Sequence, residues 1–209
     1  KGFPLIIHAT VTGWGGTFVE PGIHDYHTQL NKACDLCKAG FPIENLVIRV
    51  DPIWPTSSGL KRAAEVIEEA KSLGLLQKKK TARLRVSILD EYKHVKERIR
   101  RANHEPVYGD KFYPPVFMVE KTAEMLKNEN VPFETCAEEL LTKKCPELAA
   151  VKGCVSETDL ALMGLGIKDV NEMYENKQRR SGCHCLSCKS ELFNDRKPCP
   201  TKCIYCYWK

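Results

Sequence analysis

The chain has 209 residues, enough for one large domain or two small ones and for a hydrophobic core that needs no disulfide bonds. Hydrophobic residues make up 43% of it and charged residues 28%, as in ordinary globular proteins. The net charge of +5 is too small to indicate nucleic-acid binding by itself. Since the sequence shows neither an apolar run of membrane-spanning length nor a signal-peptide pattern, we expect a cytoplasmic protein without membrane association.

Apolar, β-branched runs that end at glycine or proline predict four strands, and segments with helical spacing of apolar residues lie between them. In chain order the predicted elements are a strand at 5–11, a helix at 24–38, a strand at 45–50, a helix capped by Ser57 or Ser58 and ending near 73, a strand at 83–89, helices at 92–102 and 114–128, and a short strand at 133–137.

This alternation of strands and helices predicts an α/β fold with a parallel sheet. We expect the repeated βα units to form a partial, open TIM-like barrel, and a doubly wound sheet is the alternative. Residues 1–150 would form this βα-repeat unit. Residues 151–209 would form a cysteine-rich, iron-sulfur-binding segment packed on the barrel rim, the two parts making one structural domain.

Polar residues cluster where the predicted strands end. Right-handed crossovers place the carboxyl ends of parallel strands on one rim, where the active sites of such folds lie. Any one of these residues could simply cap a helix or face solvent, so only their convergence indicates function. The set is Thr10, Thr12, Glu20, Arg49, Asp51, Ser87, Asp90, Glu134, Cys136 and Glu138. The candidate catalytic residues are Arg49, Asp51 and Glu134, and the candidate cofactor-binding residues are Thr10, Thr12 and Glu20.

Eleven cysteines are present, and six of them fall within the last 27 residues. The odd count and the missing signal peptide favour metal or cluster ligation over disulfide bonds. Cys199, Cys203 and Cys206 have the spacing C-x3-C-x2-C, with Tyr205 before the last cysteine. Three thiolates can hold a [4Fe-4S] cluster and leave one iron open. This is the signature of radical S-adenosylmethionine (SAM) chemistry, in which SAM binds the open iron, and we expect Tyr205 to pack beside the cofactor.

The chain has enough further cysteines to form a second metal centre. Cys183 and Cys185 are one residue apart, and alternate residues of an extended segment point the same way. Together with Cys136 and Cys154 they predict a second iron-sulfur cluster, with Cys145 or Cys188 as substitutes. A structural zinc site would use the same ligands, so the spacing leaves iron and zinc open.

Several motifs carry a resemblance to a known family. They are Glu20-Pro21, Arg49 to Ile53, Glu134 to Glu138, Gly153-Cys154, Asn176 to Arg179, Cys183 to Cys185, and Cys199 to Tyr207. On these residues the chain resembles an uncharacterised microbial domain of unknown function, whose cysteine cluster is similar to the radical SAM motif but lies at the C-terminal end. The resemblance covers most of the chain. It implies a circularly permuted arrangement: the motif of ordinary radical SAM enzymes follows the first barrel strand, whereas here it closes the chain, and the close termini of compact domains let it reach the same rim. Family members also have further strand-helix units before this segment, so either the barrel is incomplete or the recorded sequence lacks its start. Cys188 departs from the family pattern.

The sequence therefore predicts an enzyme that reductively cleaves SAM to start radical chemistry on an unknown substrate. Such an enzyme needs an electron donor, for example a ferredoxin or flavodoxin. One alternative is a zinc- or cluster-stabilised nucleic-acid-binding module, because basic and aromatic residues are interspersed in 172–209. The other alternative is an electron carrier with two clusters.

Overall fold

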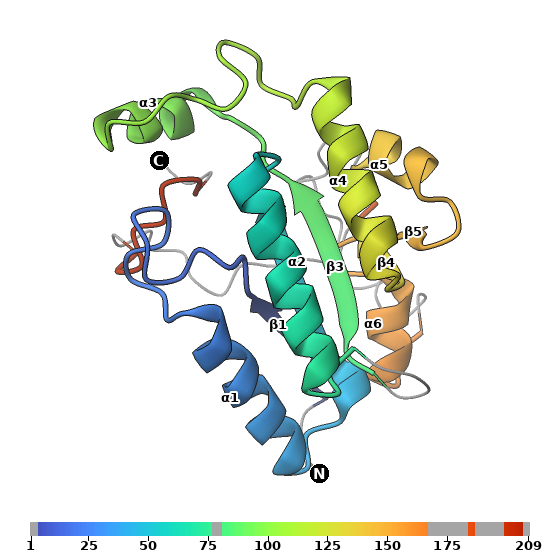
Figure 1. Cartoon of the computed structure of the whole chain (residues 1–209). Helices are drawn as coiled ribbons and strands as arrows, with labels where there is room; N and C mark the ends of the chain where they lie inside the picture. The colour runs from blue at the N-terminus through green and yellow to red at the C-terminus, as the bar shows by residue number, and fades with distance from the viewer. Residues whose placement is uncertain (1–3, 77–80, 167–183, 187–198, 207–209) are drawn as a thin grey trace.

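The computed structural model describes residues 4–76, 81–166, 184–186 and 199–206. The strands are β1 (Ile7–Thr10), β2 (Leu46–Ile53), β3 (Arg83–Ile88), β4 (Phe133–Thr135) and β5 (Ala149–Val151). The helices are α1 (Tyr26–Lys38), α2 (Ser57–Ser72), α3 (Lys93–Arg101), α4 (Val116–Glu129), α5 (Glu139–Lys144) and α6 (Glu157–Leu162), with a short 3-10 helix at Ile43–Asn45. All strand pairs are parallel, in the order β1-β2-β3-β4-β5 (Figure 1). The predicted α/β class with a parallel sheet is confirmed.

The four predicted strands and the helices between them are present, with shifted ends. β2 continues to Ile53, past the Asp51-Pro52 pair at which the sequence predicts its end. Thr56 caps α2 in place of Ser57 or Ser58, because its hydroxyl accepts a hydrogen bond from the Gly59 N–H at 3.1 Å. The sequence does not predict β5, α5 or α6, because elements of three to six residues are too short to show a hydrophobic period.

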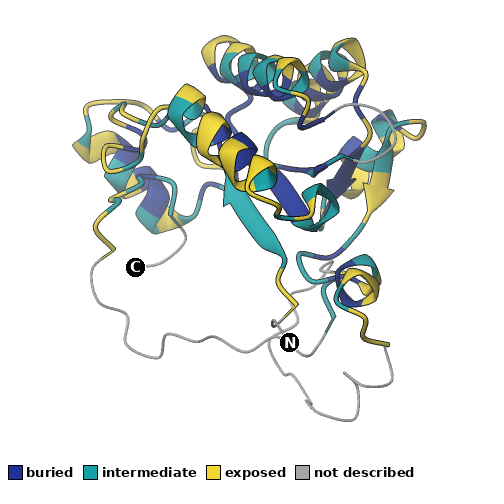
Figure 2. Cartoon of the chain, turned by 90° about the horizontal axis from the view of Figure 1, so that it is seen from below, coloured by how far each residue is buried: buried dark blue, intermediate teal, exposed yellow. Residues whose placement is uncertain are grey.

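One face of the sheet is the hydrophobic core. Ile48 and Val50 of β2 and Leu84 and Val86 of β3 are almost fully buried, in one apolar cluster with Val66 of α2. Each such side chain contributes roughly 1.5–3 kcal/mol through burial. Helices α1, α2 and α4 lie over this face (Figure 1), and their exposed residues lie along their outer sides (Figure 2). This side of the sheet is therefore covered by the three helices.

The opposite face of the sheet is polar. Successive side chains in a strand point to opposite faces, so the residues between the core positions lie on this side. Thr10 pairs in register with Arg49, Arg49 with Arg85, and Arg85 with Glu134. A row of polar side chains therefore crosses four strands on the face that the main helices leave uncovered.

A second, smaller apolar cluster lies beyond the carboxyl ends of the strands. Trp14 and Trp54 follow β1 and β2, and Val95 and Ile99 of α3 pack with them. Ile204, from between the last cysteines, joins the same cluster. Burial of this one apolar side chain brings the C-terminal cysteine segment to the rim where the sequence predicts a site.

Candidate metal centre

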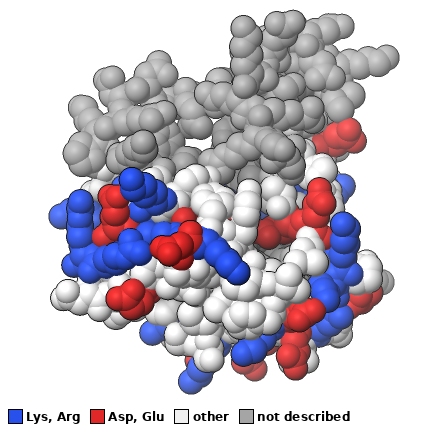
Figure 3. All heavy atoms as spheres, turned by 90° about the horizontal axis from the view of Figure 1, so that it is seen from above, with Lys and Arg blue, Asp and Glu red and all other residues white. Residues whose placement is uncertain are grey.

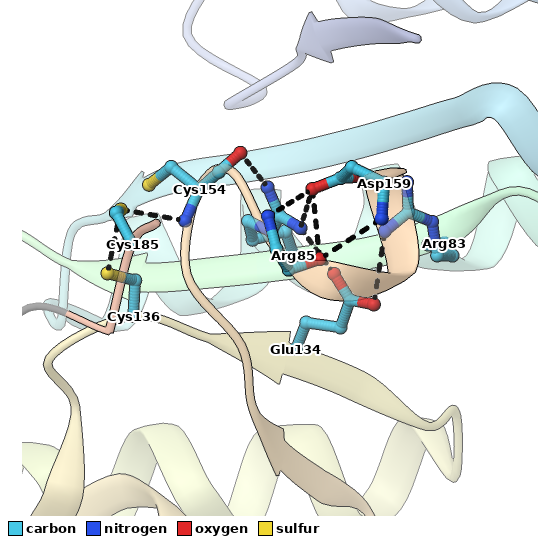
Figure 4. A network of polar contacts seen from close by, with 8 residues as sticks. Arg83, Arg85, Glu134, Cys136, Cys154, Asp159 and Cys185 are labelled. Atoms are coloured by element: carbon cyan, nitrogen blue, oxygen red, sulfur yellow. Dashed lines mark hydrogen bonds and ion pairs between the residues drawn. The ribbon is translucent and has the colours of Figure 1, made fainter. Parts of the chain in front are cut away.

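Three thiols from distant parts of the chain meet at one end of the rim. Cys136 follows β4, Cys154 lies in the loop before α6, and Cys185 belongs to the segment 184–186 (Figure 4). Their sulfur atoms all lie within 4.8 Å of one another, and the sulfurs of Cys136 and Cys185 are 3.7 Å apart. Within the residues that the structure describes, this is the one group of three Cys, His, Asp or Glu side chains that converges so closely. Thiolate sets of this kind bind zinc or iron-sulfur clusters.

The backbone around the three thiols fits a metal centre. The N–H of Cys154 donates a hydrogen bond to the sulfur of Cys185 at 3.0 Å, and the N–H of Leu186 donates to the carbonyl of Val155 at 2.9 Å. A Cβ at Gly153 would lie 2.4 Å from the Cα of Cys185, closer than any side chain tolerates. Gly153 is therefore what lets the segment 184–186 lie against the loop that carries Cys154.

The thiols perturb one another. Hydrogen bonds with Cys154 and then with Cys185, together with burial, raise the pKa of Cys136 above its ordinary value. The hydrogen bond with Cys136 lowers the pKa of Cys154, but the hydrogen bond with Cys185 and burial outweigh it and leave that pKa raised. Burial and mutual hydrogen bonding thus favour the protonated form of Cys136 and Cys154, and a metal ion must displace those protons to bind.

A buried charge network lies beside the three cysteines (Figure 4). Arg85, only 2% exposed, donates to Glu134 at 2.5 Å and to the backbone carbonyl of Cys154 at 2.9 Å. Arg83 donates to Asp159 of α6 and also reaches Glu134 at 3.4 Å. Sequence reasoning took Glu134 as a catalytic candidate, and in the structure two guanidinium groups bind its carboxylate.

Sequence reasoning missed Arg83, Arg85 and Asp159. A signal for the arginines was available, because Arg83 and Arg85 alternate with apolar residues in a strand of a predicted helix-covered sheet. Two charges on one face of such a strand indicate a polar partner on that side. Asp159 carried no comparable signal, since the short helix α6 was not predicted.

Arg49 and Asp51 meet at the carboxyl end of β2. They form an ion pair, and the hydroxyl of Ser87 donates a hydrogen bond to the other carboxylate oxygen of Asp51. Their side chains are about one-quarter exposed. Arg49 lies on the same sheet face as Glu134, with Arg85 between them in register. These candidate catalytic residues thus share one face of the sheet, and Thr10 pairs in register beside Arg49.

The C-terminal cysteines lie at the other end of the rim. Backbone hydrogen bonds join Gly22 N–H to the Thr201 carbonyl at 3.1 Å and Ile204 N–H to the Val19 carbonyl at 3.0 Å. A Cβ at Gly22 would lie 2.6 Å from the Cα of Thr201. Arg98 of α3 donates to the carbonyl of Cys206 at 2.5 Å. The segment 199–206 is therefore held between the loop after β1 and helix α3.

The thiols of this segment surround the Thr201 hydroxyl, which is 2.9 Å from the sulfur of Cys199 and 3.5 Å from that of Cys203. Hydrogen bonds from Thr201 lower the pKa of Cys199, whereas burial raises that of Cys203. The sulfurs of Cys199, Cys203 and Cys206 do not all lie within 4.8 Å of one another. The three cysteines thus share one loop, but their sulfur atoms are not close enough together to bind one small ion.

A buried carboxyl group lies beside these cysteines. Glu20 is 2% exposed, and Tyr205 donates a hydrogen bond to its Oε1 atom. Burial raises the pKa of Glu20, while hydrogen bonds with Tyr205 and Thr12 partly oppose that rise. The Oε2 atom has no hydrogen-bond partner among the described residues. The sequence candidates Glu20, Thr12 and Tyr205 are thus brought together next to Cys203.

The remaining predicted ligands are placed differently. Cys183 and Cys188 lie outside the described residues. Cys145 is fully buried in the core, where its sulfur lies 3.6 Å from the carbonyl of Ala123 of α4. Cys145 therefore has a packing role in this structure and is not one of the three converging thiols.

The family model described as Domain of unknown function (DUF1848) matches residues 1–208, so the chain belongs to that family and the resemblance inferred from its motifs is confirmed. Neither the curated proteins nor the solved structures include a significant match. Among the described residues, no helix combines the length and apolar character needed to cross a membrane.

Proposed function

We propose that this member of the DUF1848 family is a radical SAM-type iron-sulfur enzyme. Cys199, Cys203 and Cys206 would hold a [4Fe-4S] cluster, and SAM would occupy the iron that has no thiolate. Such a cluster, once reduced, cleaves SAM and supplies a 5′-deoxyadenosyl radical. The observation that carries the proposal is the attachment of the C-x3-C-x2-C segment to the rim beside Glu20, at the carboxyl ends of the strands.

The strand order supports the barrel-like interpretation. In a doubly wound sheet the order reverses at a switch point and helices cover both faces. Here the order is sequential, and helices α1, α2 and α4 cover one face (Figure 1). We therefore interpret the sheet as part of an open TIM-like barrel, with the polar face as the inner wall on which the substrate lies.

The rim residues then take distinct roles. Glu20 would accept a hydrogen bond from the amino group of SAM through its Oε2 atom, while Tyr205 holds the other oxygen. Arg49 and Asp51 would bind the substrate, since their ion pair is partly exposed on the inner wall. Thr10 and Thr12 would support these groups from β1 and its loop. The protein thus supplies orientation and exclusion of water, while the cofactor supplies the radical.

The second centre would be formed by Cys136, Cys154 and Cys185, with Cys183 as the expected fourth ligand. A [4Fe-4S] cluster there would relay electrons from a ferredoxin- or flavodoxin-like donor. Structural zinc is the competing assignment, and one distance favours it. Two ligands of a tetrahedral zinc with Zn–S bonds of about 2.3 Å lie about 3.8 Å apart. The sulfurs of Cys136 and Cys185 are 3.7 Å apart.

The surface bears on the nucleic-acid-binding alternative. On the described part of the face seen from above, Lys and Arg side chains are interspersed with Asp and Glu (Figure 3). A nucleic-acid track requires a stripe of one sign. The described residues of this face form no such stripe, and most of 172–209, on which the alternative rests, lies outside the described residues.

The proposal is tested by anaerobic purification, metal and sulfide analysis, and assay of 5′-deoxyadenosine released from SAM. We expect about four irons per chain for one cluster, with either about four more or one zinc at the second centre. Replacing Cys199, Cys203 or Cys206 by Ala should abolish SAM cleavage. Cys37→Ala, on α1 and remote from both centres, is the matched control. A protein that contains zinc alone, or one that keeps its iron but never cleaves SAM, would refute the enzyme.

A further inference from the structure

We infer that Arg85 is the positioning residue of the centre formed by Cys136, Cys154 and Cys185: its guanidinium holds two of the three thiol-bearing segments in place before metal arrives. The inference rests on the proposed second centre, but it holds for iron or for zinc. Arg85 contacts no thiol in the described structure and would act through the segments that carry them.

The geometry of one guanidinium carries the argument. One terminal nitrogen donates to the Glu134 carboxylate at 2.5 Å, and the other donates to the Cys154 carbonyl at 2.9 Å. Glu134 lies in β4 only two residues before Cys136, so a contact that fixes Glu134 also fixes the segment that carries Cys136. Arg85 thus joins the end of β4 to the loop that carries Cys154 (Figure 4).

The far side of the loop is fixed by the same network. Asp159 and Ser156 form a capping box at the start of α6, in which the Ser156 N–H donates to Asp159 at 2.7 Å. Arg83 binds the other oxygen of Asp159. The Cys154 loop is therefore held by Arg85 at its cysteine and by Arg83 at the helix that follows it.

The charges in the network balance, since two guanidinium groups face the carboxylates of Glu134 and Asp159. Buried charges persist in proteins when they are paired in this way. A variant without the charge at position 85 would leave an excess carboxylate next to the thiols. A change in its metal affinity could then come either from that charge or from displaced segments. Arg85→Lys keeps the charge but replaces a planar fork by a single ammonium group, which cannot reproduce both contacts with the same geometry.

The test uses the full-length chain with Cys199, Cys203 and Cys206 replaced by Ser, so that the second centre can be titrated alone. Apo-protein is titrated anaerobically with Co²⁺, and the thiolate-to-cobalt absorption gives both affinity and coordination geometry. We expect Arg85→Lys to weaken Co²⁺ binding about 10- to 100-fold, the usual effect of removing an outer-shell partner. Arg100→Lys, on an exposed position of α3, is the matched control and should bind like the parent.

The outcomes test the inference about Arg85 separately from the proposed second centre on which it rests. If Cys136→Ser and Cys154→Ser leave Co²⁺ affinity unchanged, the second centre itself is wrong. If those variants lose binding but folded Arg85→Lys binds Co²⁺ with parental affinity and absorption, the inference about Arg85 is overturned. Should Arg85→Lys not fold, Glu134→Gln decides, because it keeps the shape and weakens the contact to Arg85. Reduced affinity with an altered cobalt spectrum supports the inference, and parental values contradict it.

Discussion

His8 shows at the level of one residue how the polar sheet face constrains its side chains. It lies on β1, and burial followed by the charge of Arg85 lowers its pKa from 6.5 to about 4. The imidazole is therefore neutral at physiological pH. It can therefore lie near the paired charges of Arg83 and Arg85 without adding a further positive charge to them.

The His8 shift predicts a pH dependence of stability. The unfolded chain binds a proton near pH 6.5 and the folded chain only near pH 4, so folding loses stability as the pH falls through this interval. Between pH 6.5 and 4, His8 contributes at most one proton to the dependence of the unfolding free energy on pH. We expect His8→Gln to remove this contribution. Urea unfolding of the reduced apo-protein at several pH values measures it, with the exposed His104→Gln as the control for loss of an imidazole. Equal slopes for His8→Gln and the parent would contradict the assignment.

At the scale of elements, two glycines decide where the cysteine segments lie. Gly22 allows the segment 199–206 to approach the loop after β1, and Gly153 allows the segment 184–186 to approach the loop before α6. Neither position has the left-handed backbone conformation that would itself demand glycine. The requirement comes from contact with another part of the chain.

These glycines predict two separable losses. Gly153→Ala should lower metal content at the second centre severalfold while leaving SAM cleavage measurable, because a Cβ would collide with Cys185 and His184. Gly22→Ala should lower iron at the first centre and SAM cleavage, because a Cβ would collide with Pro200 and Thr201. Each variant is the control for the other, with iron, zinc and sulfide measured per chain. Loss of both centres in both variants would show that the two sites are not independently supported.

At the scale of the whole molecule, three backbone hydrogen bonds among the described residues attach the cysteine segments to loops that follow or connect the strands. Leu186 pairs with Val155, while Gly22 and Ile204 supply the backbone hydrogen bonds that hold the last segment against the loop after β1. The sheet itself is held by a large core between β2, β3, α2 and α4. Metal ligation would therefore contribute a large share of the free energy that fixes the cysteine segments, and little of that which holds the sheet.

Removal of the metal should therefore loosen the cysteine segments more than the sheet. On chelation or oxidation we expect hydrogen exchange to increase first in the described cysteine segments 184–186 and 199–206. The amides of β2 and β3 should keep their protection, because their core does not include the cysteines of either centre. Hydrogen-exchange mass spectrometry of holo- and apo-protein measures this. Uniform loss of protection across the sheet would mean instead that metal binding and global folding are one transition.

Much of this protein followed from local sequence patterns. The β-branched runs predicted β1 to β4, since hydrophobic periodicity reports on burial within a single segment. The C-x3-C-x2-C spacing made Cys199, Cys203 and Cys206 candidate ligands, because ligands so close in sequence can be proposed without knowing the fold. The rule that parallel strands end on one rim placed Arg49 and Asp51 on a common edge before any contact was known.

The tertiary structure alone decided which distant residues meet. The sequence already assigned Cys136, Cys154 and Cys185, with Cys183, to one centre, but only the tertiary structure shows that these three thiols meet, where their segments approach over Gly153. Arg85 became visible as their support only once β3 lay beside β4 in register. The physical reason is that a local pattern reports which face of a segment is buried, whereas the partner across that face depends on how every intervening element packs.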